Sequence, residues 1–524
     1  MVPAVFDLSL YLVTDSRMVP KGRALSDLVQ EAILGGVTIV QLREKTAETR
    51  DFISLARSVQ KVTKKHGIPL LINDRLDVAL AVDADGIHIG QSDMPLSEAR
   101  RILGDNRIIG VSAQTPQEAE EAILGGADYL GIGVCFDTAT KNVDPKRLQG
   151  PQGIRAIWEH VLGIKNPPKP TRAVTIGGIN QYNVDHVMKN TSSENGTQLE
   201  GVAVVSAIMA AANPQKAAEL LARKILSSKE RSWESTRFLY TSVETGQAAM
   251  VREMKTAFTR IRGAQGIRPL VQHITNNVVV ADSANACLAL GGSPIMSRAP
   301  DEQQDLSTAI SALLINIGTI DQQQIPGIRQ AMKHAQLNRT PIVLDPVGVG
   351  ASEFRKQVIQ ELLRDYSVDV IKGNAAEISS LLDSQEVSQK GVDSLGKGFA
   401  NPSAAVRTLS LRHRCLVVMT GEIDYVSDGA SVFAIHNGHA LQASITGSGC
   451  MAGTAIATFI VVGNSLVYPI ASVLTGLVAI NLSAEHAASR ADVKGPGTFV
   501  SAFIDEMHNL TEEQFASRAR IELV

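Results

Sequence analysis

Eight short apolar segments in the first 210 residues constrain the fold more than any other feature of this sequence. Most are separated by a stretch in which apolar residues recur at helical spacing, such as residues 25–34 and 52–63. Strands that alternate with helices predict a parallel sheet. Eight such units in just over 200 residues predict a closed (β/α)8 barrel, or TIM barrel. The segments are residues 8–13, 37–42, 68–72, 86–89, 107–111, 129–134, 173–176 and 202–205.

A short internal repeat supports this order. Residues 31–36 and 121–126 both read Glu-Ala-Ile-Leu-Gly-Gly. Each copy is predicted to end a helix with glycine and to lead into the next strand.

The segment 39–45 (Ile-Val-Gln-Leu-Arg-Glu-Lys) begins as an apolar strand and ends in polar residues. Gln41, Arg43 and Lys45 share one face, because side chains alternate along a strand. A planar guanidinium and a mobile ammonium two residues apart suit an anion with several oxygens, such as a diphosphate. An edge strand with a solvated charged face would give the same pattern and is the plainer alternative.

The other predicted strands also end in polar residues or glycines, and in a barrel these ends meet at one mouth, where active sites lie. Asp74 and Asp93 follow neighbouring strands, so that two carboxylates are placed to share Mg²⁺. Gly177-Gly178 and the turn at Ser206 would offer backbone N–H groups to a second phosphate. His88 lies inside a strand, where a lone histidine is more often a core residue. The strand ends carry Thr14, Asp15, Gln41, Arg43, Lys45, Asn73, Asp74, Asp93, Ser112, Thr138, Thr140, Lys141, Gly178 and Ser206.

Five motifs in this region together resemble thiamine-phosphate synthase, over about residues 8–226. They are Gln-Leu-Arg-Glu-Lys at 41–45, Ile-Asn-Asp at 72–74, Gly-Ile-His-Ile-Gly-Gln-Ser-Asp at 86–93, Gly-Val-Ser at 110–112 and Val-Ser-Ala-Ile at 205–208. That family joins a hydroxymethylpyrimidine diphosphate to a thiazole phosphate and releases pyrophosphate. The resemblance implies a diphosphate site, a Mg²⁺ site, a pyrimidine site and a thiazole phosphate site. The diphosphate site would comprise Arg43, Lys45, Asn73 and Lys141, and the Mg²⁺ site Asp74 and Asp93. The pyrimidine site would comprise Gln41 and Ser112. The thiazole phosphate site would comprise Thr138, Thr140, Gly178, Val205 and Ser206.

These residue types suit a reaction in which the diphosphate leaves first. The pyrimidine then stabilises a carbon cation, which the thiazole nitrogen captures. Such a reaction needs electrostatic stabilisation of the leaving group and positioning of the nucleophile, and it needs no strong base.

The second half of the chain is predicted to form an open α/β sheet with helices on both faces. Strand-like runs lie at 313–316, 342–344, 368–371 and 415–419, with helical stretches such as 283–289 and 357–363 between them. Residues 227–250 are polar and hold no clear apolar face, so they are predicted to be a linker or a connecting helix. A helix at 251–261 is predicted to open the second domain.

Residues 445–453 (Ile-Thr-Gly-Ser-Gly-Cys-Met-Ala-Gly) precede a long apolar stretch with helical character. Glycines let backbone N–H groups approach an anion, and a helix N-terminus adds partial positive charge. The segment therefore predicts an anion hole for a transferring phosphoryl group. Cys450 is predicted to have a lowered pKa there and to act as a weak base. A glycine-rich turn with a small buried cysteine is the alternative.

Five further motifs together resemble hydroxyethylthiazole kinase, a member of the ribokinase-like group, over about residues 255–515. They are Gln-His-Ile-Thr-Asn-Asn-Val-Val at 272–279, Leu-Gly-Gly-Ser-Pro-Ile-Met at 290–296, Leu-Asp-Pro-Val-Gly-Val-Gly-Ala at 344–351, Lys-Gly-Asn-Ala-Ala-Glu at 372–377 and Lys-Gly-Pro-Gly-Thr-Phe at 494–499. That family phosphorylates the alcohol of the thiazole with MgATP. The resemblance implies that Asn276 and Met296 contact the thiazole, and that Asn374 and Glu377 organise Mg²⁺ and the phosphates near Asp345. Lys372, Thr420 and Gly447 would contact ATP, and residues 447–450, which include Cys450, would form the anion hole.

The two resemblances fit each other, because the product of the second half is a substrate of the first. The order resembles that of the bifunctional thiamine-biosynthesis enzymes of fungi. It implies a synthase domain at 1–228, a connecting segment at 229–254 and a kinase domain at 255–524. The family kinase is a trimer, so the resemblance also implies a homo-oligomer, built on a kinase trimer or arranged as a hexamer.

Composition limits the partners and the compartment. The formal net charge of −3 argues against nucleic acid or an anionic membrane as the main partner. The apolar region 450–482 is interrupted by Gly463-Asn464-Ser465 and by Pro469, which predicts two buried helices and no membrane span. The four cysteines show no paired or ligand-like spacing, which favours a reducing compartment, the cytoplasm.

Two other functions remain open from the sequence. A sugar-phosphate isomerase or lyase barrel fused to a vitamin kinase would need a Schiff-base lysine or a carboxylate base as its central residue. A thiamine-responsive regulator would bind ligand without turnover and would release no pyrophosphate.

Overall fold

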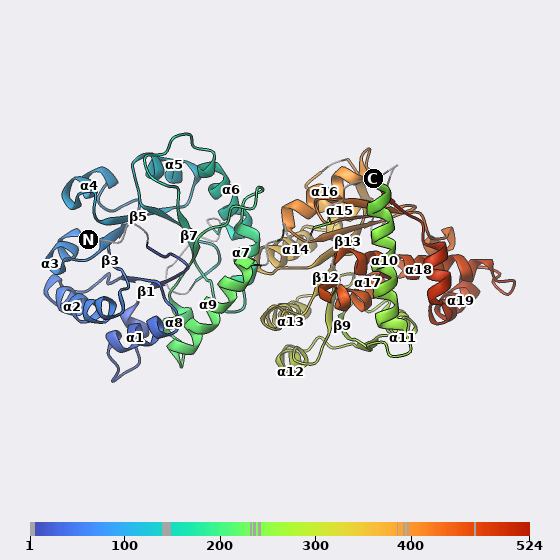
Figure 1. Ribbon diagram of the computed structural model, residues 1–524. Helices are drawn as coiled ribbons and strands as arrows, with labels where there is room; N and C mark the ends of the chain where they lie inside the picture. The colour runs from blue at the N-terminus through green and yellow to red at the C-terminus, as the bar shows by residue number, and fades with distance from the viewer. Residues whose placement is uncertain are drawn as a thin grey trace. The chain divides into compact units, whose positions relative to one another are not determined.

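The chain divides into two compact units, Met1–Ser232 and Trp233–Val524, each with its own sheet. Figure 1 presents the computed structural model, which describes residues 6–138, 148–230, 233, 237–238, 243–384, 386–390, 393–395, 398–465 and 468–524. Residues 233–254 lie within the segment predicted to connect the domains, and they belong to the second unit.

The first unit is a closed barrel of eight parallel strands, as predicted, and its helices surround the strands (Figure 1). Each strand pairs with the next along the chain, and β8 pairs with β1 to close the ring. A strand forms at each of the eight predicted places, with ends that differ from the predicted ones by at most two residues. The strands are β1 (Leu10–Val13), β2 (Ile39–Leu42), β3 (Leu70–Asn73), β4 (Gly86–Ile89), β5 (Ile108–Ala113), β6 (Tyr129–Gly133), β7 (Ala173–Ile176) and β8 (Gly201–Val204). The helices are α1 (Leu25–Leu34), α2 (Thr49–His66), α3 (Leu76–Val82), α4 (Leu96–Leu103), α5 (Pro116–Leu124), α6 (Gly150–Leu162), α7 (Val184–Thr191), α8 (Ser206–Met209) and α9 (Pro214–Glu230).

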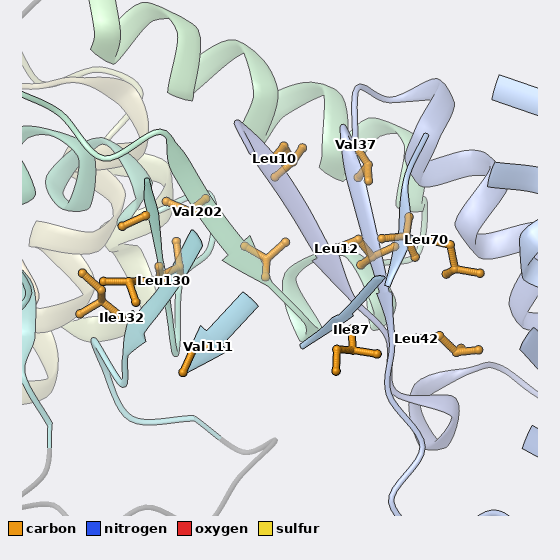
Figure 2. Packing of buried hydrophobic residues seen from close by; sticks show 14 of the residues in the cluster. Leu10, Leu12, Val37, Leu42, Leu70, Ile87, Val111, Leu130, Ile132 and Val202 are labelled. Carbon is orange, nitrogen blue, oxygen red and sulfur yellow. The ribbon is translucent and has the colours of Figure 1, made fainter. Parts of the chain in front are cut away.

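The alternation of side chains along the strands builds two separate apolar layers. Leu10 and Leu12 point outward into the layer between barrel and helices, where Figure 2 shows them with Val202. Tyr11 and Val13 point inward and join the smaller cluster inside the barrel. A fully buried leucine contributes about 1.5–3 kcal/mol relative to an exposed one, so the outer layer holds the strands in register against the helices.

The repeated Glu-Ala-Ile-Leu-Gly-Gly segments occupy equivalent places, as predicted. The first copy closes α1 and the second closes α5. In each copy the second glycine is left-handed, with φ of 105° at Gly36 and 82° at Gly126, a conformation that glycine adopts without strain. A Cβ atom on Gly35 would lie 2.3 Å from the carbonyl oxygen of Gln215, so α9 packs closely against this turn.

The second unit contains a nine-stranded sheet, in the order β10-β9-β11-β12-β13-β16-β17-β18-β19. The first six strands are parallel and the last three run antiparallel to their neighbours. The four strands predicted from the sequence are β11 (Ala312–Asn316), β12 (Ile342–Asp345), β13 (Val370–Asn374) and β16 (Leu416–Thr420). The sequence missed β9 (Leu270–Ile274), β10 (Ser293–Ile295), β17 (Asp424–Ser427), β18 (Val432–Ile435) and β19 (Ile521–Leu523) in this sheet, and the separate hairpin of β14 (Ser388–Lys390) and β15 (Asp393–Leu395).

Helices cover both faces of this sheet, as predicted. One face carries α10 (Val243–Arg262), α11 (Val280–Ala289), α17 (Ser448–Phe459), α18 (Ile470–Ser489), α19 (Pro496–Asn509) and α20 (Glu512–Arg518). The other carries α13 (Gln324–Asn338), α14 (Glu353–Asp365), α15 (Ala375–Leu381) and α16 (Pro402–His413), and the short α12 (Gln303–Leu306) contacts α13. Consecutive strand residues such as Leu313 and Leu314 pack on opposite faces.

The apolar region 450–482 forms α17 and α18, two buried helices, as predicted. α18 is long and apolar enough to cross a membrane by length and composition, but 94% of its most apolar window is buried inside the protein. It contacts α17 and α19 and therefore serves as the central helix of this unit's core.

Candidate active sites

A cavity of about 360 Å³ opens at the carboxyl ends of the barrel strands. Eleven of the residues predicted for the first site line it: Gln41, Arg43, Lys45, Asn73, Asp74, Asp93, Ser112, Thr138, Gly178, Val205 and Ser206. Two others, Thr140 and Lys141, lie outside the described residues. The volume suits a ring compound of drug-like size.

Gln41, Arg43 and Lys45 all line the cavity, although β2 ends at Leu42. The residues between them do not. Leu42 is buried in the layer between barrel and helices, and the Glu44 carboxylate accepts a hydrogen bond from Ser16 Oγ. The alternation expected for a strand therefore continues past its last residue, helped by the hydrogen bond from Arg43 N to Thr14 Oγ1 (3.1 Å).

Asp74 and Asp93 face each other beside the Lys45 ammonium. Lys45 forms an ion pair with Asp74, and Asp93 Oδ2 accepts a hydrogen bond from Gly90 N (2.7 Å). Burial raises the pKa of Asp74 and the hydrogen bond with Asp93 raises it further, while Lys45 partly offsets both. Burial acts against ionisation of Asp93 too, but Asp74, Gly90 N–H and Lys45 outweigh it and lower the pKa of Asp93. Two adjacent carboxyl groups with opposed pKa shifts are groups that a further cation would stabilise.

Asn73 offers an unused donor to the same cavity. Its side chain is 6% exposed, and its Nδ2 has no hydrogen-bond partner within the described part of the chain. Buried polar atoms are nearly always paired, so this amide is set for an acceptor that enters the cavity.

A chain of polar side chains crosses the inside of the barrel next to the cavity. Gln41 Nε2 donates to the Tyr11 hydroxyl (2.8 Å), and the Tyr11 and Tyr129 hydroxyls are 2.7 Å apart. His88 Nδ1 lies 2.8 Å from the Tyr129 hydroxyl, and His88 Nε2 lies 2.9 Å from Ser112 Oγ. Burial lowers the pKa of His88 to about 4, so its ring is neutral at neutral pH.

The sequence did not single out Tyr11 and Tyr129, because a tyrosine in an apolar strand has the pattern of a core residue. His88 was expected to be a core residue. It is buried, yet it also lines the cavity and contacts Ser112.

Gly178, Val205 and Ser206 lie on the rim formed by β7 and β8. Gly178 is left-handed (φ 64°), and a Cβ atom there would lie 2.5 Å from the Asp137 carbonyl oxygen. A side chain at this position would therefore collide with the segment that leads to Thr138.

The second site lies at the carboxyl ends of β12 and β13. Lys372 Nζ and Asp345 Oδ1 are 3.0 Å apart, and both side chains are buried. Asn374 caps α15 in a capping box with Glu377, whose other carboxylate oxygen accepts a hydrogen bond from Gly348 N (2.9 Å). Thr420 pairs with Asn374 in the sheet register.

Burial shapes the ionisation of this group. It raises the pKa of Glu377 to about 7, and it raises that of Asp345, in both cases against the pull of Lys372. Burial alone would lower the pKa of Lys372, but Asp345 and Glu377 hold it above its usual value. The site therefore keeps a cation beside two carboxyl groups whose pKa values are both raised by burial.

The predicted anion hole is the start of α17. Gly447 caps the helix in a left-handed conformation (φ 84°), and a Cβ atom there would lie 2.4 Å from Val279 Cγ1. A Cβ atom on Gly449 would be 3.4 Å from Lys372 Nζ, and one on Gly453 would be 3.3 Å from Asp345 Oδ2. The buried ion pair thus lies directly against the first turns of this helix.

The predicted lowering of the Cys450 pKa is wrong. Burial raises the pKa of the Cys450 thiol to about 11, and the nearby Asp345 adds to the increase. Lys372 and two amide donors, Asn316 Nδ2 (3.2 Å) and Asn276 Nδ2 (3.5 Å), only partly offset it. The positive end of a helix does not compensate for removing a thiolate from water.

Asn316 was missed by the sequence analysis. Its amide nitrogen also donates to Asp345 Oδ2 (2.9 Å), and its oxygen accepts from Asn276 Nδ2 (2.9 Å). It ends the predicted run 313–316, so the reasoning used for the barrel, that polar residues end strands at the site, would have found it. Met296 directly follows β10, the strand that pairs with β9, and is 36% exposed.

The described residues contain no group of three or more His, Cys, Asp and Glu side chains that would hold a metal by themselves. Pairs of carboxyl groups are the more relevant donor set, because Mg²⁺ is commonly held by one or two carboxylates together with substrate phosphates. Asp74 and Asp93, whose carboxyl groups are hydrogen-bonded to each other at the cavity, fit that requirement.

Comparison with known proteins matches the two halves of the chain to two different families, in the same order as the two sets of sequence motifs. The family model of thiamine monophosphate synthase matches residues 10–208, and that of the hydroxyethylthiazole kinase family matches residues 261–513. The thiamine-phosphate synthase of Clostridium novyi is 47% identical over 213 residues, which cover 41% of this chain and 96% of that protein.

Two fungal proteins match almost the full length. The probable thiamine biosynthetic bifunctional enzyme of Schizosaccharomyces pombe is 40% identical over 512 residues, covering 97% of this chain and 96% of that protein. The thiamine biosynthetic bifunctional enzyme of Saccharomyces cerevisiae is 36% identical over 537 residues, with the same coverage of 97% and 96%. The chain therefore belongs to the family of bifunctional thiamine biosynthetic enzymes, with a thiamine monophosphate synthase region followed by a hydroxyethylthiazole kinase region.

Proposed function

We propose that the second unit transfers the terminal phosphoryl group of ATP to the alcohol of hydroxyethylthiazole. The first unit then joins the thiazole phosphate to hydroxymethylpyrimidine diphosphate, which yields thiamine phosphate and pyrophosphate. The observation that carries this proposal is the convergence of Arg43, Lys45 and Asn73 with the Asp74–Asp93 pair on one barrel cavity.

In the first unit the bond between the pyrimidine methylene carbon and the diphosphate oxygen breaks first. The diphosphate keeps the electron pair, and the carbon becomes a cation stabilised by the pyrimidine. Arg43 and Lys45 neutralise the departing charge and Asn73 Nδ2 donates to it, after which the thiazole nitrogen gives its lone pair to the carbon. No proton has to be removed before these steps, so catalysis comes from electrostatics and positioning.

Mg²⁺ is the expected cofactor of both units. Asp74 and Asp93 would hold it in the first unit, and Glu377, with Asn374 and Asp345 close by, would organise it in the second. A bound Mg²⁺ supplies positive charge to phosphate oxygens. Without it, the protein's own contribution in the first cavity is the cationic pair of Arg43 and Lys45.

In the second unit the start of α17 and Lys372 stabilise the phosphoryl group in transfer, while Thr420 and Gly447 contact the nucleotide. Asn276 and Met296 contact the thiazole. Phosphoryl transfer has a loose transition state and relies mainly on positioning and charge. In this proposal Cys450 lies beside the alcohol, and its thiol is protonated in the unliganded protein because burial raises its pKa to about 11.

The remaining assignments of the proposal follow the family resemblance. Residues 1–228 carry the synthase and 255–524 the kinase, and the protein works in the cytoplasm as a homo-oligomer built on a kinase trimer or arranged as a hexamer. Its partners are small molecules, with neither nucleic acid nor membrane among them.

A coupled assay of the purified chain tests the proposal. Thiamine phosphate should form only when hydroxyethylthiazole, MgATP and the pyrimidine diphosphate are all present. Omitting the pyrimidine diphosphate should leave ADP formation, and supplying thiazole phosphate should remove the need for ATP. Binding of these ligands without release of pyrophosphate would instead indicate a regulator that does not turn over.

A further inference from the structure

Five polar side chains from five strands form one continuous hydrogen-bonded chain inside the barrel. They are Gln41, Tyr11, Tyr129, His88 and Ser112, joined in that order by contacts of 2.7–2.9 Å. Tyr11 and Tyr129 are 1% and 0% exposed, so their hydroxyl hydrogens must find acceptors inside the protein. Gln41 and Ser112, the two ends of the chain, both line the substrate cavity.

The donors and acceptors of this chain fit together in one direction. Gln41 Nε2 donates to the Tyr11 oxygen, so the Tyr11 hydroxyl hydrogen goes to Tyr129, the other hydroxyl within reach. The Tyr129 hydrogen then goes to His88 Nδ1, which leaves the ring hydrogen on Nε2. His88 Nε2–H donates to Ser112 Oγ.

With the Gln41 amide oriented as it is in the structure, the opposite direction leaves a buried hydrogen without a partner. If Ser112 donated to His88 and Tyr129 donated to Tyr11, the Tyr11 oxygen would accept from both Gln41 and Tyr129. Its own hydrogen would then have no acceptor among the contacts described for it. A buried unpaired donor is costly, so this orientation of the Gln41 amide goes with the first direction. The opposite direction requires the amide to turn as well, so that its oxygen accepts from the Tyr11 hydroxyl.

We propose that this chain sets the hydrogen-bond polarity of the cavity, presenting an acceptor at Gln41 Oε1 and a donor at the Ser112 hydroxyl. Such a pair selects a flat ring that carries an amino group beside an unprotonated ring nitrogen. An aminopyrimidine has that pattern, and this inference deepens the proposed synthase function and rests on it. Tyr11, Tyr129 and His88 are positioning residues, because they act through Gln41 and Ser112.

In such a chain the orientation of the Gln41 amide and that of the Ser112 hydroxyl depend on each other. In the analogue whose amino group is replaced by a carbonyl oxygen, the ring presents an acceptor to Gln41 and a ring N–H to Ser112. To bind it, the amide and the hydroxyl would have to reverse together, along with every hydrogen between them. A break in the middle of the chain frees each end to reverse alone.

The full-length protein tests this with two substrates, the aminopyrimidine diphosphate and its carbonyl analogue. The quantity measured is the ratio of their kcat/KM values in the synthase reaction. Tyr129→Phe keeps the ring and removes the hydroxyl that joins the two halves, and it should lower the ratio by about tenfold or more, mainly through a lower KM for the carbonyl analogue. Tyr11→Phe should act in the same direction.

Thr63→Val is a matched control in the same barrel. It removes a buried hydroxyl that bonds to the Gln60 carbonyl oxygen on α2, away from the cavity, and it should leave the ratio unchanged. Kinase activity, measured in the same samples, should be unaltered in all three variants. A Tyr129→Phe protein that keeps both synthase activity and the wild-type ratio would overturn the proposal.

The tautomer of His88 gives a second test that requires no variant to be active. Nitrogen NMR of histidine-labelled wild-type protein should show His88 with a bare Nδ1 and a protonated Nε2, the signals being assigned by their loss in His88→Gln. The opposite tautomer, or a ring protonated on both nitrogens, would overturn the proposal. A wild-type protein that makes no thiamine phosphate would refute the proposed function instead, and the tautomer would still be readable.

Discussion

Arg43 and Glu44 are neighbours in the chain, but only Arg43 lines the barrel cavity, while Glu44 accepts a hydrogen bond from Ser16. Arg43→Ala should therefore lower synthase kcat/KM by about 10²–10³, the usual effect of removing one charge-stabilising donor. Phosphorylation of the thiazole by the same protein should continue at the wild-type rate. Both rates are measured in one coupled assay.

Glu44→Gln provides the control, because it changes the adjacent charge without touching the cavity, and it should keep synthase activity. If Arg43→Ala lost both activities equally, a folding defect would explain the result better than a lost contact.

The raised pKa of Cys450 predicts how the alkylation rate of its thiol depends on pH. A value raised to about 11 means that the thiol form dominates at every pH below that value. In the unliganded protein, alkylation of Cys450 should be very slow at neutral pH and should accelerate only as pH approaches 11. Mass spectrometry of the Cys450 peptide measures this, and fast labelling at pH 7 would contradict it.

In the kinase assay Cys450→Ala should lower turnover and Cys450→Asp should preserve it, whereas full turnover of the alanine variant would leave no role for a base.

Charged side chains at strand ends could be predicted from the sequence, because parallel strands bring their carboxyl ends together whatever the details of packing. Partners that are distant in the chain could not. Tyr11 and Tyr129 are 118 residues apart, and only the closed ring of strands brings their hydroxyls within 2.7 Å. The ionisation of Cys450 also depends on burial, which a motif does not reveal.

Among the elements, α17 and α18 lie unusually close together at Gly476. A Cβ atom on Gly476 would be 2.8 Å from the carbonyl oxygen of Ala455, so a larger residue would force the two helices apart. Because α17 begins at the predicted anion hole, Gly476→Val should lower kinase kcat by about tenfold or more, and overpacking should lower the free energy of unfolding of this unit by about 1–3 kcal/mol. Steady-state kinetics and denaturant unfolding measure the two effects.

Ser489→Val places the same side chain on the exposed end of α18 and should change neither quantity by much. Unaltered kinase activity in Gly476→Val would mean that the start of α17 does not depend on this helix contact.

The strands differ in how far the sequence revealed them. The eight barrel strands are mostly apolar and are separated by helices along the chain, and all eight were predicted. In the second sheet β9 reads Leu-Val-Gln-His-Ile, and its polar Gln272 is buried because it bonds to Gln303 and to the Ser297 carbonyl oxygen. Such a strand is stabilised by tertiary partners, so hydrophobic periodicity alone does not identify it.

At the scale of the whole molecule, each of the two units has apolar clusters of its own among the described residues. We expect two unfolding transitions in calorimetry. Pyrophosphate should raise only the transition of the first unit and ATP only that of the second. The stabilisation should be about 2.7 kcal/mol at a ligand concentration of 100 Kd, by mass action. A single transition that both ligands move equally would show that the two units unfold together.

The contacts made by residues before 255 determine where a fragment that contains only the C-terminal half should begin. The Phe238 ring lies 5.6 Å from that of Phe433 and 4.6 Å from that of Tyr468, and Met250 and Met254 are fully buried in the same cluster. A fragment that begins at 255 would leave three holes in its interior, at about 2–5 kcal/mol for each large side chain removed. A fragment that begins before Trp233 would retain all three side chains, and it is the better choice for expressing the C-terminal half alone.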